Sequence, residues 1–150
     1  MIEQRDVLQW AVDRFGAVAR NVDERAARLV EEAIEIAQAA GVKLETVEKI
    51  ARRTYSRPVS KDIGQEIGGC GITLLGFCES TNYNFESELA REWYRVSQLP
   101  PEYWERKHAE KVVDGTANLS PTADTPRHTV EHNETHGGLT QCDMHDDESI

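Results

Sequence analysis

The chain has 150 residues, which suits one domain or one domain plus a tail, and its apolar fraction of 39% is somewhat low for a globular protein. It carries 17 basic against 27 acidic residues, a net charge of −10, which argues against a nucleic-acid-binding surface because phosphate contacts need clustered Lys and Arg. A nucleotide substrate is still compatible with this charge, since a bound cation reverses the sign of a local site. No apolar run is long enough to span a membrane, so we expect no membrane partner.

Cysteine usage and the first residues of the chain predict a cytoplasmic location. Charges occur in Met1–Asp6, where a signal peptide would have its apolar region. The cysteines are Cys70, Cys78 and Cys142, an odd number without a Cys-x-x-Cys pair. This pattern favours reduced thiols in a cytosol.

The first third of the chain predicts two helices. Residues 2–15 place their apolar side chains on one helical face, and Gly16 ends that segment. Asn21 or Asp23 is a suitable N-cap for a second helix, which continues to about Ala40.

The middle of the chain predicts two further helices. The third covers residues 44–55 and ends before Pro58, and Ser60 is expected to cap a fourth over roughly 61–79. This fourth helix is the most apolar, yet it contains five glycines that each cost on the order of 1 kcal/mol relative to Ala. Close helix–helix approach is the simplest compensation, so we expect this helix to be buried. A strand over 72–77 is the alternative, but it has no second strand to pair with.

The last ordered segments are also helical. Asn84 is expected to cap a fifth helix over 85–97, and a sixth runs from Pro100 to about Val113. Residues 1–113 are therefore predicted to form an all-α bundle with short connections. Residues 114–150 have one basic residue against eight acidic ones, a net charge of −7, and no aromatic residue. We expect this acidic, His-containing tail to be disordered.

Three acids of the second helix form the first candidate site. Glu31, Glu32 and Glu35 are i,i+3 and i,i+4 neighbours, so their carboxylates crowd one patch and repel each other. Arg28 offsets part of this repulsion, and Mg²⁺ would offset more because hard cations bind carboxylate oxygens. The alternative is a solvated acidic helix face.

Glu66 is the second candidate, because it lies in the apolar fourth helix. An ionised Glu in such a setting is costly unless it is paired or bound to a metal. Pairing with Arg52, Arg53 or Arg57 is one explanation. The other is a carboxylate metal site, with three acids from one helix and one from a facing helix.

At this point the chain resembles a family. Glu31-Glu32-x-x-Glu35, followed roughly thirty residues later by an acidic motif on an apolar helix, resembles the all-α nucleoside triphosphate pyrophosphohydrolases of the MazG-like type. The resemblance covers roughly residues 5–110. It implies cleavage of a nucleoside triphosphate substrate to the monophosphate and pyrophosphate, with Mg²⁺ or Mn²⁺ as cofactor. By position, Glu32, Glu35 and Glu66 would be metal ligands, with Glu35 also a catalytic residue. Glu31 would be a further ligand or the base that orients the attacking water.

One position departs from the family's pattern. Its second motif is Glu-x-x-Asp, and Gly69 stands at the Asp position. Asp62, four residues before Glu66, would face the same way and is the candidate replacement ligand. Alternatively, Gly69 would leave room for water or substrate. A third interpretation is that the protein binds nucleotide or metal but turns over poorly. The alternative function is therefore a catalytically weak or inactive helical module that binds nucleotide or metal, or that serves assembly.

Four residues are candidates for substrate contacts, each with a plainer alternative. Trp10 is placed to stack on a base, or else packs in the bundle. Asn82 would reach a sugar or phosphate, or else forms a turn. Arg106 and Lys107 would neutralise phosphate charge, or else lie on a solvated helix face.

The fourth helix also predicts self-association. Its glycines recur at nearly one-turn spacing, and its apolar residues exceed what one face of a small bundle covers. We expect a homodimer or a higher homo-oligomer built partly on this helix.

Overall fold

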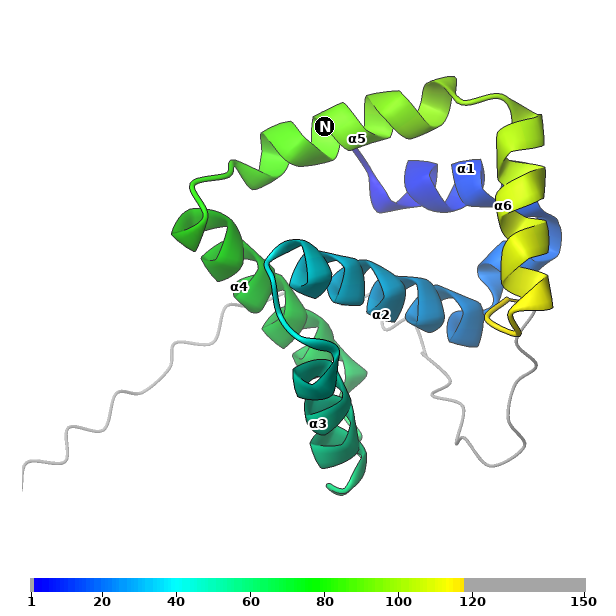
Figure 1. Cartoon of the computed structure of the whole chain (residues 1–150). Helices are drawn as coiled ribbons and strands as arrows, with labels where there is room; N and C mark the ends of the chain where they lie inside the picture. Colours follow the sequence, from blue (N-terminus) through cyan, green and yellow to red (C-terminus); the bar gives the residue numbers. More distant parts are fainter. Residues whose placement is uncertain (1, 118–150) are drawn as a thin grey trace, which may run out of the picture.

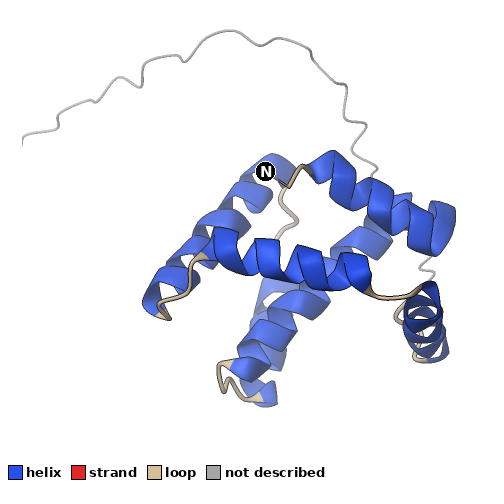
Figure 2. Cartoon of the chain, turned by 90° about the horizontal axis from the view of Figure 1, so that it is seen from above, coloured by secondary structure: helices blue, strands red, loops and turns tan. Residues whose placement is uncertain are grey.

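The computed structural model describes residues 2–117, and every regular element in that range is helical (Figure 2). The elements are α1 (Gln4–Phe15), the 3-10 helix η1 (Gly16–Arg20), α2 (Val22–Ala39), α3 (Leu44–Tyr55), α4 (Ile63–Ser80), α5 (Phe85–Gln98) and α6 (Pro101–Val113). The all-α prediction is confirmed for this part of the chain.

Side-chain caps define the start of three helices. The Asn21 side chain accepts hydrogen bonds from the backbone N–H groups of Asp23 (2.8 Å) and Glu24 (3.4 Å), as expected for α2. Asn84 likewise caps α5. The prediction that Ser60 caps α4 is wrong, because the Asp62 carboxylate occupies that role and the Ser60 hydroxyl instead accepts from the Asp62 backbone N–H.

The turn between α1 and α2 is the one local element that the sequence did not predict. Gly16 adopts a φ of 73°, which an L side chain rarely adopts, and the next residues form η1 instead of an open loop. This short helix packs against both α1 and α2 and buries Ala19. It therefore fixes how the first two helices cross.

An aromatic cluster joins the two ends of the described chain. Trp10 of α1 has edge-to-face contacts with Phe15, with Trp93 of α5 and with Trp104 of α6, at centroid distances of 5.1–6.2 Å. Figure 1 shows α6 crossing beside the ends of α1 and α5, with α2 below them. Such rings bury a large apolar area, so this cluster is the main core.

The remainder of the core is small. Within residues 2–117, only Ala11, Ala19, Ala117 and Glu24 are buried, and no large side chain is fully buried. Ala117 lies beyond the predicted domain boundary at Val113, and the neighbouring Thr116 carbonyl accepts a hydrogen bond from Arg28. Thr116 and Ala117 therefore contact the helices, while the predicted tail beyond residue 117 lies outside the described residues.

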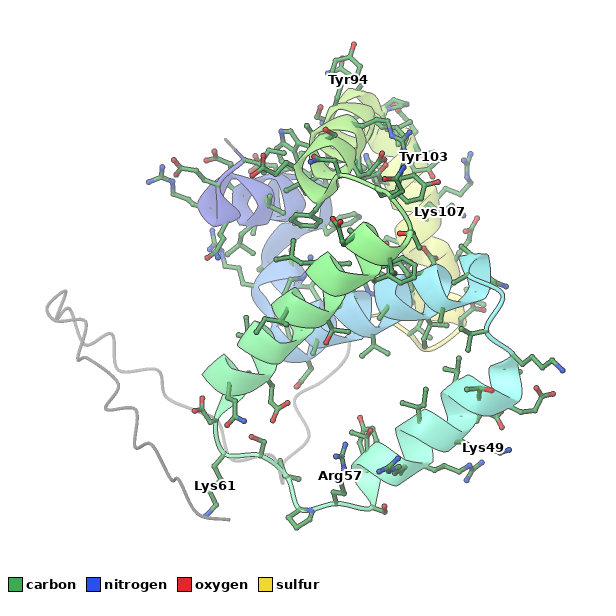
Figure 3. All side chains as sticks on the ribbon, turned by 90° about the vertical axis from the view of Figure 1, so that its left-hand side faces the viewer. Lys49, Arg57, Lys61, Tyr94, Tyr103 and Lys107 are labelled. Carbon is green, nitrogen blue, oxygen red and sulfur yellow. The ribbon has the colours of Figure 1, made fainter. Side chains whose placement is uncertain are left out.

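Helices α3 and α4 are the most exposed elements. They overlap in Figure 1, but the perpendicular view in Figure 3 shows them apart, joined by the linker that carries Arg57 and Lys61. The exposed fraction is 65% for Ile67 and 76% for Ile72, so the prediction that α4 is buried is wrong within one chain.

No other helix of the described residues lies close to the glycines in the middle of α4. A Cβ added at Gly68, Gly69, Gly71 or Gly76 would meet no atom within 4 Å. The predicted helix–helix approach is therefore not made by the described residues. The physical reason is that α4 packs extensively against none of the other helices in the part of the chain that the structure describes.

Substitution of the α2 cap tests the local basis of this fold. Asn21→Ala removes the acceptor for two backbone N–H groups and should lower the free energy of unfolding by about 1 kcal/mol. Urea unfolding followed by circular dichroism measures this loss. Asn21→Asp keeps the acceptor and should retain wild-type stability, so equal losses in both variants would contradict the cap assignment.

Candidate functional site

The three acids of α2 do not share one environment. Glu31 is half-buried and accepts hydrogen bonds from Arg28 and from Lys111 of α6, the latter at 2.7 Å. Arg28 also lies 3.5 Å from the buried carboxylate of Glu24. Glu31 is therefore held by two cations, whereas Glu32 and Glu35 are exposed.

Glu32 is the most electrostatically perturbed of the three acids. Desolvation by neighbouring atoms raises the pKa of its carboxyl, and repulsion from Glu35 and Glu31 raises it further. Attraction from Lys111 opposes these effects, and Glu92 of α5 adds a smaller repulsion. An acid whose charge is disfavoured in this way would be stabilised by a bound cation.

Glu92 is a member of this acidic group that the sequence analysis missed. Its carboxylate accepts hydrogen bonds from Arg95 at 2.8 and 2.5 Å, and this pairing lowers the pKa of Glu92 and keeps it ionised. The Glu92–Arg95 spacing is visible in the sequence. The effect of Glu92 on Glu32 is not visible in the sequence, because it depends on how the tertiary structure places α5 relative to α2.

The second acidic motif stands apart from the first. Asp62 caps α4 and accepts from the Gln65 backbone N–H at 3.0 Å, and Glu66 is exposed in the first turn. The expected pairing of Glu66 with the arginines of α3 and its linker is not found among the described ion pairs. Between residues 2 and 117, no three Asp, Glu, His or Cys side chains form a group able to hold a metal. The predicted ligands are therefore not brought together in one chain.

Gly69, which stands where the motif has Asp, faces open space. A Cβ at this position would meet no atom within 4 Å, and the backbone of α4 is helical here. An Asp side chain would therefore fit without displacing a neighbour. Its absence is a property of the sequence and not a requirement of packing in this chain.

The candidate substrate residues lie in different settings. Trp10 is in the aromatic cluster, as the packing interpretation predicts, and Asn82 is in a turn with a φ of 60°, as the turn interpretation predicts. The Arg106 guanidinium lies 5.6 Å from the centroid of the Tyr103 ring. Lys107 donates to Glu110 at 3.0 Å and also lines a small cavity at the foot of α6.

The helices that the structure describes include none long and apolar enough to cross a membrane. Comparison of the chain with protein-family models, with curated proteins and with solved structures finds no match.

Proposed function

We propose that this protein is a Mg²⁺-dependent nucleoside triphosphate pyrophosphohydrolase with a bundle of the all-α, MazG-like type. The observation that carries the proposal is the crowding of the α2 acids, where desolvation and then repulsion from Glu35 and Glu31 raise the pKa of Glu32. Acids crowded in this way form a donor set of hard oxygen ligands, which fits Mg²⁺ or Mn²⁺. The Glu31-Glu32-x-x-Glu35 motif supports the same conclusion.

The roles of the side chains follow from their environments. Glu32 and Glu35 are exposed and would hold the metal, which when bound neutralises phosphate charge and lowers the pKa of the attacking water. Glu31 is held by Arg28 and Lys111, so its carboxylate has a defined orientation. It would orient the water and accept its proton.

The proposal includes a second copy of the chain. Helix α4 carries four exposed apolar side chains, Ile63, Ile67, Ile72 and Leu75, which are between 51% and 76% exposed. Full burial of such a side chain contributes roughly 1.5–3 kcal/mol, and a two-fold interface would gain this twice. The partner would also bring a second set of acids to Glu66, which belongs to no group of three potential metal ligands among residues 2–117.

One observation favours the alternative function, a helical assembly module with little or no turnover. The apolar side chains of α4 are exposed within the described residues, and Gly69 stands where one carboxylate is expected. In that case self-association would persist without Mg²⁺-dependent hydrolysis.

Pyrophosphate release separates the two functions. The full chain is incubated with a panel of natural and modified nucleoside triphosphates, with Mg²⁺ and with a chelator. The proposed enzyme releases pyrophosphate and monophosphate in equal amounts, and only with the metal. A panel that gives no metal-dependent release, while the chain still self-associates, would favour the assembly module.

A further inference from the structure

A small cavity lies where η1, the start of α2 and the last turns of α6 meet, at the right-hand side of Figure 1. Its volume is about 60 Å³. Its walls combine two aromatic rings with four permanent cations: Phe15, Trp104, Arg25, Arg28, Lys107 and Lys111. This composition is unexpected in a chain whose net charge is −10.

The positive charge of the cavity is only partly neutralised. Glu24 is the one carboxylate in its wall and attracts Arg25 and Arg28. Glu31 pairs with Arg28 and Lys111, and Glu110 pairs with Lys107. Arg25 makes none of the ion pairs described for residues 2–117. The lining cations therefore outnumber the acids that contact them.

Two donors in the cavity wall have no acceptor. The Nε atom of Arg25 and the Nε1 atom of Trp104 are shielded from solvent and lack a hydrogen-bond partner in the described part of the chain, whereas the Nε atom of Arg28 lies 3.5 Å from the Glu24 carboxylate. Unsatisfied buried donors are costly, so such groups normally face a ligand, an ion or water. An oxygen anion would offer an acceptor to both.

We propose that this cavity binds a phosphoryl group. A cavity needs roughly 10–15 Å³ of such volume to hold one water molecule, so a volume of about 60 Å³ has room for a tetrahedral anion. Guanidinium forks favour phosphate oxygens because they bind them in a bidentate manner. The remainder of a phosphorylated ligand would lie outside the cavity. This inference does not depend on the proposed hydrolysis, because it involves neither Glu32 nor a metal.

Binding of inorganic phosphate and pyrophosphate to the full chain tests the proposal. The titration is done without a metal, at low salt, by calorimetry and by Trp fluorescence, which reports on Trp104 in the cavity wall. We expect saturable binding to one site per chain with a Kd of about 1 mM or below for at least one of the two anions. Acetate at the same concentrations should bind at least about ten-fold more weakly.

Two variants and one control locate the site. Arg25→Gln and Lys107→Met should each weaken phosphate binding by about ten-fold. The Lys107 side chain is 46% exposed, so Lys107→Met should leave the fold intact. It therefore tests the site even where Arg25→Gln disturbs folding. The control, Lys49→Met, removes the same charge from α3, away from Lys107 in Figure 3. This variant should bind phosphate as the wild type does.

Two results would overturn the proposal. One is the absence of saturable binding of either anion up to about 10 mM at low salt. The other is an equal loss of affinity in Lys49→Met and Lys107→Met, which would indicate nonspecific attraction to surface charge. Neither result bears on pyrophosphate release by the α2 acids, so the two proposals fail separately.

Discussion

Glu32→Gln is expected to abolish both Mg²⁺-dependent pyrophosphate release and the stabilisation of the chain by Mg²⁺. In the wild type, a cation that binds only the folded state raises the melting temperature by mass action. At about 100 times its Kd, Mg²⁺ would add roughly 2.7 kcal/mol to the free energy of unfolding. Removal of a proposed ligand should eliminate this gain, as differential scanning calorimetry with and without Mg²⁺ measures.

The same variant should stabilise the protein when no metal is present. Because the pKa of Glu32 is raised in the folded state, its protonated form is favoured there, and the folded state loses stability as the pH rises through that pKa. At neutral pH the uncharged Gln removes this penalty. We therefore expect Glu32→Gln to have a higher melting temperature than the wild type in chelator, with the difference vanishing at acidic pH where Glu32 is protonated.

Two further variants make this test specific. Glu48→Gln removes an exposed acid from α3 and should retain the wild-type response to Mg²⁺. Gly69→Asp supplies the missing carboxylate in open space and should strengthen the response if α4 contributes to the site. An undiminished Mg²⁺ shift in Glu32→Gln would exclude the α2 acids as the metal site.

Ile67→Asp and Ile72→Asp should convert a dimer into monomers. Both side chains are largely exposed in the single chain. In an apolar interface the Asp carboxylate would have to lose its water without gaining a partner, which is costly. A two-fold interface contains the substitution twice, so a loss of at least about 3 kcal/mol is expected, on the order of 100-fold in Kd. Light scattering coupled to size exclusion, over a range of protein concentrations, measures the mass.

A matched control separates the interface from a general effect of charge. Val59→Asp places the same charge in the linker between α3 and α4, at a residue that is 91% exposed, and should leave the dimer intact. A wild-type chain that remains monomeric at about 100 μM would contradict the interface on α4. Dissociation of Val59→Asp to the same degree would place the interface elsewhere.

Gly68→Leu probes the small-residue surface of α4 independently of charge. The position is open in the single chain, so the larger side chain does not disturb its fold, and Leu favours a helix over Gly. In a close two-fold interface the same side chain would separate the backbones. A variant that is more stable as a monomer but weaker as a dimer is the expected combination.

The sequence by itself determined the helices of this protein. Asn21 and Asn84 cap α2 and α5 as predicted, because an Asx side chain satisfies N–H groups within three residues of itself. The same local reasoning failed between Ser60 and Asp62, where two capping residues compete and the stronger acceptor of the α4 N–H groups lies two residues later. The crowding of Glu31, Glu32 and Glu35 also followed from helical spacing alone.

Only the tertiary structure decided what surrounds these helices. Glu92 of α5 repels Glu32, and Lys111 of α6 donates a hydrogen bond to Glu31. Both residues lie more than fifty positions from α2 in the sequence, so only the tertiary structure brings them close. The apolar residues of α4 predicted burial, but apolarity does not specify which surface provides it, and within one chain these residues are exposed. The cavity at Arg25 was likewise invisible in the sequence, since its cations come from two helices whose contact is set by η1 and the aromatic cluster.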